Sequence, residues 1–173
     1  MIEEYDLSIK PRDYQIEAYK FAIEHERGMV ISPTASGKSL IIYMLCRHYL
    51  NMINNNILII VPTTSLVEQL YKDFKDYGYD VEKHVSRKYH GYDIDEDKRI
   101  VISTWQSLYK MPKKFFEDYG AVIGDEAHLF KAVSLTKIMT KLTDCKYRVG
   151  LTGTLDDSKT HKLVLQGLFG TVN

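Results

Sequence analysis

Five short, mainly apolar runs divide the chain, and a longer segment with a different apolar spacing follows each of them. Runs of this length without a regular polar alternation are typical of strands that are buried on both faces of a parallel sheet. We therefore predict strands at residues 29–31, 57–61, 100–102, 121–123 and 147–151, with Tyr119-Gly120 marking a turn before the fourth.

The segments between these runs carry apolar residues at helical spacing. This spacing predicts helices at residues 11–26, 37–53, 134–142 and 163–169. Another helix should follow Pro62 and bury Leu66, Leu70 and Phe74, with Ser65 and Glu68 as its capping box. Alternating strands and helices predict an α/β fold with a mostly parallel sheet, right-handed crossovers and helices on both faces.

Residues 80–99 do not follow this pattern clearly. Val81 to Val85 is consistent with a strand, but basic residues and tyrosines then interleave before an acidic stretch. Basic and aromatic side chains together can bind a nucleic-acid strand. A solvated loop is the alternative interpretation.

A phosphate-binding loop is predicted at residues 32–39, Ser-Pro-Thr-Ala-Ser-Gly-Lys-Ser, between the first strand and the helix that follows. The backbone N–H groups of Thr34, Ala35, Ser36 and Gly37 would converge on phosphate oxygens at the helix N-terminus. Lys38 would reach the terminal phosphates, and the Ser39 hydroxyl would bind the accompanying Mg²⁺.

Polar clusters follow the predicted strands, where ligands bind in open parallel sheets. They are residues 32–39, 62–65, 103–106, 125–128 and 152–154. In the fourth cluster, Asp125 could hold Mg²⁺ opposite Ser39 and Glu126 could activate the attacking water, unless both are merely solvated residues at a strand–helix junction. The hydroxyls of Ser103 and Thr104 could bind phosphates or cap the next turn.

The composition indicates an ordered globular protein but does not indicate what it binds. The 173 residues fit one domain, and 45% hydrophobic with 27% charged residues argues against disorder. Lysine plus arginine equals aspartate plus glutamate at 23 each, so any nucleic-acid binding must rest on a local face. Two widely spaced cysteines, an acidic start and no membrane-length apolar run predict a cytoplasmic protein of a bacterium or a phage-infected host.

These motifs resemble, in order, those of the first RecA-like motor domain of superfamily-two helicases and translocases with a DEAH motif. The matching stretches are Arg12 with Gln15, residues 32–39, 61–64 with Leu66 and Gln69, 103–106, Asp125-Glu126-Ala127-His128 and 151–154. Within the superfamily, residues 57–64, 73–77 and 104–106 look most like the phage UvsW type of branched-DNA helicase. Ser32 and Gly124 depart from the pattern without removing a side chain that would contact nucleotide.

The resemblance implies roles for further residues. Arg12 and Gln15 would recognise the adenine of ATP. A DNA backbone would contact Pro62, Thr63, Thr64, Ser103, Thr104, Trp105 and Gln106 without sequence preference. His128, Thr152, Gly153 and Thr154 would couple hydrolysis to movement. The implied function is ATP-dependent remodelling of branched, replication or recombination DNA intermediates.

Helicases of this kind close the ATP site with a second RecA-like lobe that supplies arginines, and we expect residues 1–173 to form the first lobe alone. Without those arginines, we expect weak ATP binding and slow hydrolysis. The alternatives are a non-catalytic ATP-binding or nucleic-acid-docking module and the motor lobe of a restriction or remodelling complex. A small-molecule kinase fits poorly, because residues 125–128 and the two strand-contacting clusters would have no use.

Overall fold

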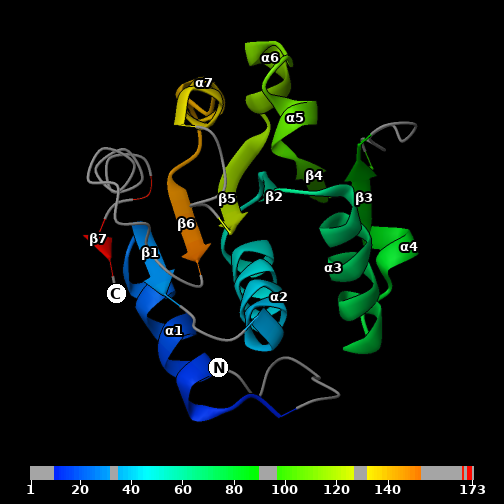
Figure 1. Cartoon of the computed structure of the whole chain (residues 1–173), viewed down its shortest axis with the longest axis vertical. Coiled ribbons are helices and arrows are strands. Elements are labelled where there is room, and N and C mark those ends of the chain that lie inside the picture. The colour runs from blue at the N-terminus through cyan, green and yellow to red at the C-terminus, as the bar shows by residue number, and fades with distance from the viewer. Residues whose placement is uncertain are drawn as a thin grey trace.

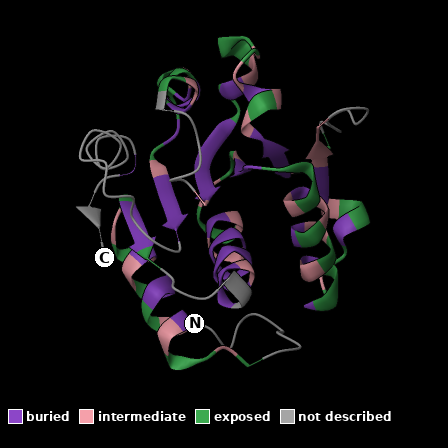
Figure 2. Ribbon diagram, in the orientation of Figure 1, coloured by how far each residue is buried: buried purple, intermediate pink, exposed green. Residues whose placement is uncertain are grey.

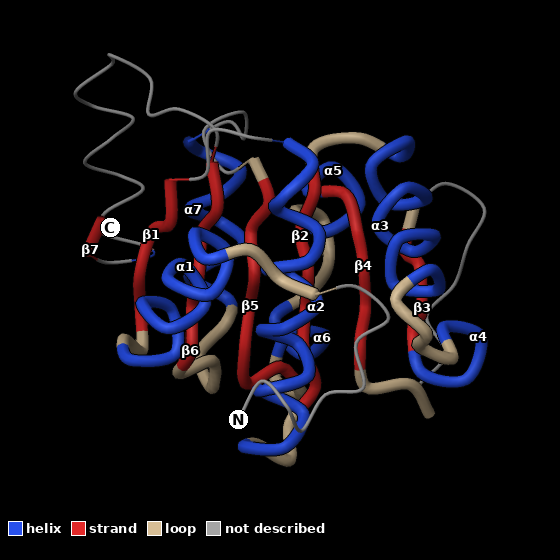
Figure 3. Tube along the Cα trace, turned by 90° about the horizontal axis from the view of Figure 1, so that it is seen from below, coloured by secondary structure: helices blue, strands red, loops and turns tan. Residues whose placement is uncertain are grey.

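A single sheet runs through the computed structural model, which describes residues 10–31, 35–89, 97–126, 132–152, 169 and 171–172. Its strand order is β3-β4-β2-β5-β6-β1-β7, and every pairing is parallel. Figure 3 shows these strands side by side, from β7 and β1 at one edge to β3 at the other. The predicted parallel α/β fold is confirmed.

The strands are β1 (Arg27–Ile31), β2 (Asn56–Val61), β3 (Val85–Lys88), β4 (Ile100–Thr104), β5 (Tyr119–Asp125), β6 (Tyr147–Thr152) and β7 (Thr171–Val172). The helices are α1 (Asp13–Glu24), α2 (Ala35–Met52), α3 (Thr64–Asp76), α4 (Val81–His84), α5 (Trp105–Leu108), α6 (Lys113–Phe116) and α7 (Ala132–Lys141). Most predicted boundaries lie within two residues of these.

Helices cover both faces of the sheet, as the sequence predicted. Alternate residues of β1, β2, β4 and β5 enter opposite cores, so Ile59 packs with α1, α2 and α3 whereas Leu58 packs with α5, α6 and α7. Figure 1 shows the two groups of helices on either side of the strands, and Figure 2 shows that the strands between them are almost entirely buried. This double burial explains why the strands appear in the sequence as unbroken apolar runs.

The register aligns the carboxyl ends of the strands at one edge. Val61 pairs with Thr104, Asp125 with Leu151, and Ile31 with Thr152. The chain leaves each of these strands into one of the predicted polar clusters. We call this carboxyl edge of the sheet the rim.

Two predictions about local structure were wrong. Residues 81–84 form the single turn α4, because the Asp80 side chain accepts a hydrogen bond from the Lys83 N–H at 3.3 Å, and the strand begins only at Val85. The cap of α3 is Thr63, whose Oγ1 accepts from the Leu66 N–H at 3.2 Å, not Ser65.

Two further predictions need adjustment. Tyr119 and Gly120 belong to β5 and are not a turn before it. Glu68, the expected capping partner of Ser65, instead pairs with Arg87 of β3 at 2.8 Å. Arg87 also lies 4.1 Å from the centre of the Tyr71 ring. This part of residues 80–99 is therefore ordered against α3, while residues 90–96 lie outside the described residues.

Arg99 makes a connection that no sequence pattern indicated. Its guanidinium donates to the backbone carbonyls of Leu50, Ile53 and Asn55, at 2.6–3.1 Å. These carbonyls belong to the end of α2 and the turn after it, which a helix leaves without internal partners. Arg99 thus fixes the end of α2 beside the start of β4.

Both cysteines are free and buried, as expected. Burial raises the pKa of the Cys145 thiol to about 12. Among the helices that the structure describes, none has the length and apolarity needed to cross a membrane.

Candidate functional site

Lys38 and two consecutive acidic residues form a charged cluster at the rim. Lys38 begins the second turn of α2, while Asp125 ends β5, which is separated from β1 by β6. The Lys38 ammonium lies 3.6 Å from the Asp125 carboxylate and contacts that of Glu126. Lys38 and Asp125 are only 4% and 8% exposed, so these charges interact with little solvent between them.

Glu126 has an unusual backbone conformation. Its φ is +52°, in the left-handed region that residues with a β-carbon seldom adopt. Such strain costs on the order of 1–3 kcal/mol and occurs often at functional sites. In this conformation the Glu126 carboxylate contacts Lys38.

Gln15 links the first helix to the phosphate-loop helix. Its side-chain oxygen accepts from the Arg12 N–H at 2.7 Å, and its side-chain nitrogen donates to the Gly37 carbonyl at 3.2 Å. Gln15 is 6% exposed, whereas the Arg12 residue is exposed. Each end of a carboxamide can make a further hydrogen bond, so these contacts leave capacity for an adenine edge.

The Ser39 hydroxyl contacts the far end of α3. Its Oγ lies 2.6 Å from the Tyr77 hydroxyl oxygen and is hydrogen-bonded to the Asp73 carboxylate. Burial raises the pKa of Asp73 and that of Tyr77, and in both cases the Ser39 contact opposes the shift. The sequence singled out Ser39 but neither of these partners, which lie 34 and 38 residues farther along the chain.

The donor set fits a magnesium nucleotide. Lys38, Asp125 and Glu126 together carry one net negative charge, and a carboxylate such as that of Asp125, together with phosphates, is the sparse oxygen set on which Mg²⁺ relies. The hydroxyl of Ser39, the other predicted magnesium ligand, contacts Tyr77 in this structure. Within the described part of the chain, no three His, Cys, Asp or Glu side chains gather into a cluster that could hold a metal by themselves. The phosphates would have to complete the coordination.

Two predicted strand-contacting segments meet at the rim. The Gln106 side chain donates to the Pro62 carbonyl at 3.3 Å, joining the start of α5 to the loop before α3. Thr63, Thr64 and Gln106 are exposed, and Trp105 is half-buried. The buried member of the first segment is Pro62.

The hydroxyls of Ser103 and Thr104 are used within the protein. Ser103 is fully buried and donates to the carbonyls of Lys88 and Thr104, at 2.9 and 3.1 Å. Thr104 is 3% exposed and caps α5 by accepting from the Ser107 N–H at 3.4 Å. Of the two uses that the sequence left open for these hydroxyls, the structure has the capping role for Thr104.

The remaining predicted residues divide into three groups. Thr152 ends β6 fully buried beside Ile31. His128, Gly153, Thr154 and Ser32 to Thr34 lie outside the described residues, and for Ala35 and Ser36 only the backbone is described.

Comparison with known proteins identifies relatives along nearly the whole chain. Residues 8–157 match the family described as "Type III restriction enzyme, res subunit". The ATP-dependent DNA helicase UvsW of Enterobacteria phage T4 is 36% identical over 168 residues, covering 95% of this chain and 34% of the relative. The DNA 3'-5' translocase XPB2 of Sulfurisphaera tokodaii is 31% identical over 157 residues, covering 90% of this chain and 33% of the relative.

Solved structures agree with these matches. The crystal structure of the UvsW helicase from bacteriophage T4 superposes with a TM-score of 0.87 at 34% identity, over 95% of this chain and 60% of that one. The Hef helicase domain of Pyrococcus furiosus gives a TM-score of 0.78 at 21% identity, over 94% of this chain and 38% of that one, which supports the fold alone.

The chain spans about a third of the length of the curated relatives UvsW and XPB2. By name, UvsW is an ATP-dependent DNA helicase and XPB2 is a DNA translocase, and each match covers at least 90% of this chain. The chain therefore belongs to the family of type III restriction enzyme res subunits, and it is a first motor domain of the superfamily-two helicase kind, similar to that of phage UvsW.

Proposed function

We propose that this chain is the ATP-binding lobe of an ATP-dependent DNA helicase or translocase that acts on branched, replication or recombination intermediates. The observation that carries the proposal is the buried contact of Lys38 with Asp125 and Glu126, because it joins the phosphate loop to the acidic pair. The names of the relatives support the choice of DNA as the substrate.

Each residue of the cluster has a role in this proposal. Lys38 would exchange its carboxylate partners for the terminal phosphates, and Asp125 together with Ser39 would then be free to hold Mg²⁺. A metal held there would neutralise charge that develops on the phosphates. Glu126 orients the attacking water and accepts its proton, and the start of α1 at Arg12 and Gln15 recognises the adenine.

The proposal includes a second RecA-like lobe, supplied in cis or in trans. Arginines from such a lobe would stabilise the transition state, and groups of this kind are worth on the order of 10³ to 10⁵ in rate. We therefore expect the first lobe alone to bind ATP weakly and to hydrolyse it slowly.

An ATPase assay tests these roles. The chain is measured with and without an added second lobe from a relative, on single-stranded and on forked DNA. Turnover should rise only when the lobe and DNA are both present. A Glu126→Gln variant should still bind ATP but lose turnover, while Glu117→Gln, an exposed glutamate after α6, should match the unmodified chain. Fast DNA-stimulated turnover by the first lobe alone would contradict the proposal.

DNA contact is proposed at the exposed part of the rim. Thr63, Thr64 and Gln106 are accessible to a DNA backbone, and Ser103 contributes by shaping the strand end, since its hydroxyl is buried. Backbone contacts carry no sequence information. Binding should therefore depend on strandedness and not on sequence, which oligonucleotides of different sequence and equal length would test.

The matched family favours a second candidate, the motor lobe of a restriction complex. Both candidates would use the same ATP site, and we infer that the second would act on intact duplex DNA without a branch. Stimulation of the two-lobe ATPase by covalently closed duplex, equal to that by forked DNA, would favour this candidate.

A further inference from the structure

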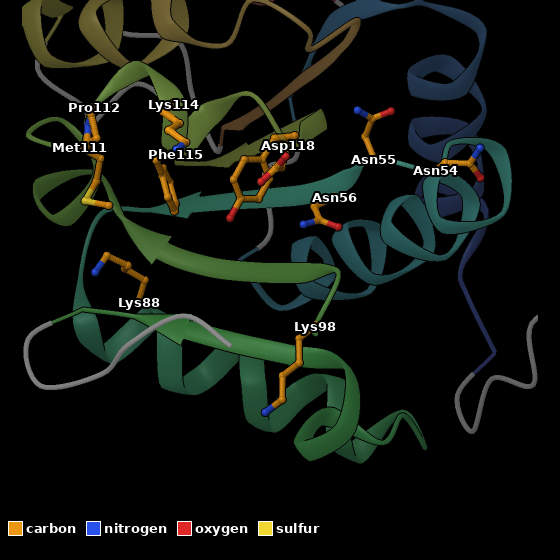
Figure 4. Close-up of a pocket in the computed structure, with 11 residues that line it drawn as sticks. Asn54, Asn55, Asn56, Lys88, Lys98, Met111, Pro112, Lys114, Phe115 and Asp118 are labelled. Carbon is orange, nitrogen blue, oxygen red and sulfur yellow. The ribbon is translucent and has the colours of Figure 1, made fainter. Parts of the chain in front are cut away.

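A pocket of about 900 Å³ lies on the α5–α6 side of the sheet, away from the nucleotide cluster. Its lining comes from the turn before β2, from the end of β3, from Lys98 just before β4, and from the segment between α5 and β5. Figure 4 shows side chains of all these groups around it. Neither Lys38 nor the acidic pair lines the pocket, so the nucleotide site does not account for it.

The described residues that line the pocket carry an excess of positive charge, although the whole chain is neutral. Lys88, Lys98 and Lys114 line it, and Asp118 is the one acidic residue among the described lining residues. Three cations against one anion give a formal charge of +2, whereas the full sequence balances at zero. An anionic ligand therefore matches the pocket better than a neutral or cationic one.

The lysines are spread along the pocket and do not converge on one point. Lys88 pairs with Ser103, whereas Lys98 lies five residues before Ser103, so about five residue steps, or ~16 Å, separate them along the strand direction. Lys114 lies on the opposite wall in α6 (Figure 4). Charges distributed in this way suit a ligand with several phosphates in a row more than a single phosphate.

The lining is held in place by hydrogen bonds from outside the pocket. Lys141 of α7 donates to the carbonyls of Tyr109 and Met111, at 3.1 and 2.8 Å, and so fixes the turn before α6. On the other side, Arg99 binds the Asn55 carbonyl at 2.9 Å, and the Asn56 N–H donates to the Asp118 carbonyl at 2.7 Å. The pocket is thus built before a ligand arrives, which lowers the cost of binding.

One end of the pocket, at Lys88, lies near the rim, and the other end lies at the amino ends of β2, β4 and β5. The Lys88 carbonyl accepts the hydrogen bond of Ser103, the residue before the α5 cap, and the segment after α5 supplies Met111 and Phe115 to the lining. The half-buried Phe115 ring offers an aromatic surface on which a base can stack. A strand bound at the rim can therefore extend into the pocket.

We propose that this pocket binds single-stranded DNA that continues from the rim, with Lys88, Lys98 and Lys114 on different phosphates of the strand and Phe115 against a base. The proposal rests on the proposed function, because the strand must first be held at the rim. It adds a second contact region on the first lobe, next to the edge strand β3.

Salt dependence of DNA binding tests the pocket directly. Fluorescein-labelled oligo-dT of about 20 nucleotides, longer than one binding site, is titrated with the chain at several salt concentrations. Each lost phosphate contact lowers the salt slope on a single strand by about 0.7, so Lys88→Ala/Lys114→Ala should lower it by roughly 1.4 and weaken binding. Lys88→Arg/Lys114→Arg should have the salt slope and the affinity of the unmodified chain. The control Lys20→Ala/Lys137→Ala removes exposed lysines of α1 and α7 and should change neither the slope nor the affinity.

The outcomes separate the pocket from the proposed function. Equal affinity and slope in the alanine variant and the unmodified chain, or no binding of oligo-dT by the unmodified chain, would overturn the pocket proposal. Failure of the unmodified chain to bind ATP would overturn the proposed function and is measured independently with a fluorescent ATP analogue. Phe115→Leu should weaken oligo-dT binding severalfold but leave an abasic oligonucleotide of the same length unaffected, and an equal effect on both would rule out stacking.

Discussion

At the scale of single residues, the left-handed backbone of Glu126 makes a measurable prediction. A β-carbon in this conformation costs roughly 1–2 kcal/mol that glycine does not pay. Glu126→Gly and Glu126→Ala both remove the carboxylate that contacts Lys38, so they differ mainly in this strain. We expect the glycine variant to be the more stable by about 1 kcal/mol in urea unfolding, and equal stability would show that the turn relaxes when the side chain is lost.

The hydrogen bond between Tyr77 and Ser39 leads to a second residue-scale prediction. Because Ser39 is proposed to bind Mg²⁺, its 2.6 Å contact with the Tyr77 hydroxyl competes with the metal. Tyr77→Phe removes that competitor, which is worth about 0.5–1.5 kcal/mol, so Mg²⁺-dependent ATP binding should tighten about 2- to 10-fold. The matched control is Tyr79→Phe, because the Tyr79 ring packs on the Tyr43 ring as the Tyr77 ring does.

The measurement is the affinity for a fluorescent ATP analogue in Mg²⁺ and in EDTA. A gain that appears only with Mg²⁺ supports the competition between Tyr77 and the metal. The same gain in EDTA would mean that Tyr77 affects the loop in some other way.

At the scale of elements, Arg99 is expected to carry much of the connection between α2 and β4. Its guanidinium binds three carbonyls at the end of α2, and Arg99→Ala leaves them without these partners. We expect the free energy of unfolding to fall by about 2–3 kcal/mol, seen as a lower denaturant midpoint with an unchanged slope. Lys20→Ala on the exposed side of α1 should have almost no effect. If Arg99→Ala lowered the free energy of unfolding as little as Lys20→Ala does, water would have replaced Arg99 as the hydrogen-bond partner of the three carbonyls.

Strands that are buried on both faces could be predicted from the sequence. The first residues of helices, which depend on the capping side chain, could not be located exactly. The run 57–61 has no polar residue to place in solvent, so a central strand was the natural interpretation. Thr63 and Ser65 carry the same hydroxyl, and only the end of β2 at Val61 decides that Thr63 becomes the cap. Residues 81–84 were misjudged because Val81 and Val85 are both buried, which fits a strand or a turn of helix equally well.

At the scale of the whole molecule, the sheet explains which parts of the candidate site the sequence could reveal. Lys38 and Asp125 each follow a predicted strand, and parallel strands deliver their carboxyl ends to one edge whatever their order. The strand order β3-β4-β2-β5-β6-β1-β7 depends on how the connecting helices pack on the two faces of the sheet. The contact of Ser39 with Tyr77 and the pocket beside α6 both depend on that packing, so neither could be predicted from the sequence.

Stability of the whole domain should depend on pH through His48 in α2. Burial lowers the pKa of His48 below its usual 6.5, so the unfolded chain takes up this proton more readily than the folded one. The stability that His48 contributes is therefore fully present above pH 6.5 and is lost as the pH falls through the folded pKa. Asp73 acts in the opposite direction, since burial raises its pKa and its contribution is lost as the pH rises above the usual 3.8.

The two effects can be separated by comparing variants between pH 7.5 and pH 5.5. The free energy of unfolding of the unmodified chain should fall across this range, and His48→Gln should reduce the fall, because glutamine does not titrate. Asp73→Asn should leave the His48 effect in place and make the fall larger if the raised pKa of Asp73 extends into the range. An equal fall in the unmodified chain and in His48→Gln would mean that groups other than His48 govern the acid sensitivity. It would also mean that the site of His48, whose ring lies against that of Tyr19 with centroids 6.0 Å apart, tolerates the charged imidazole.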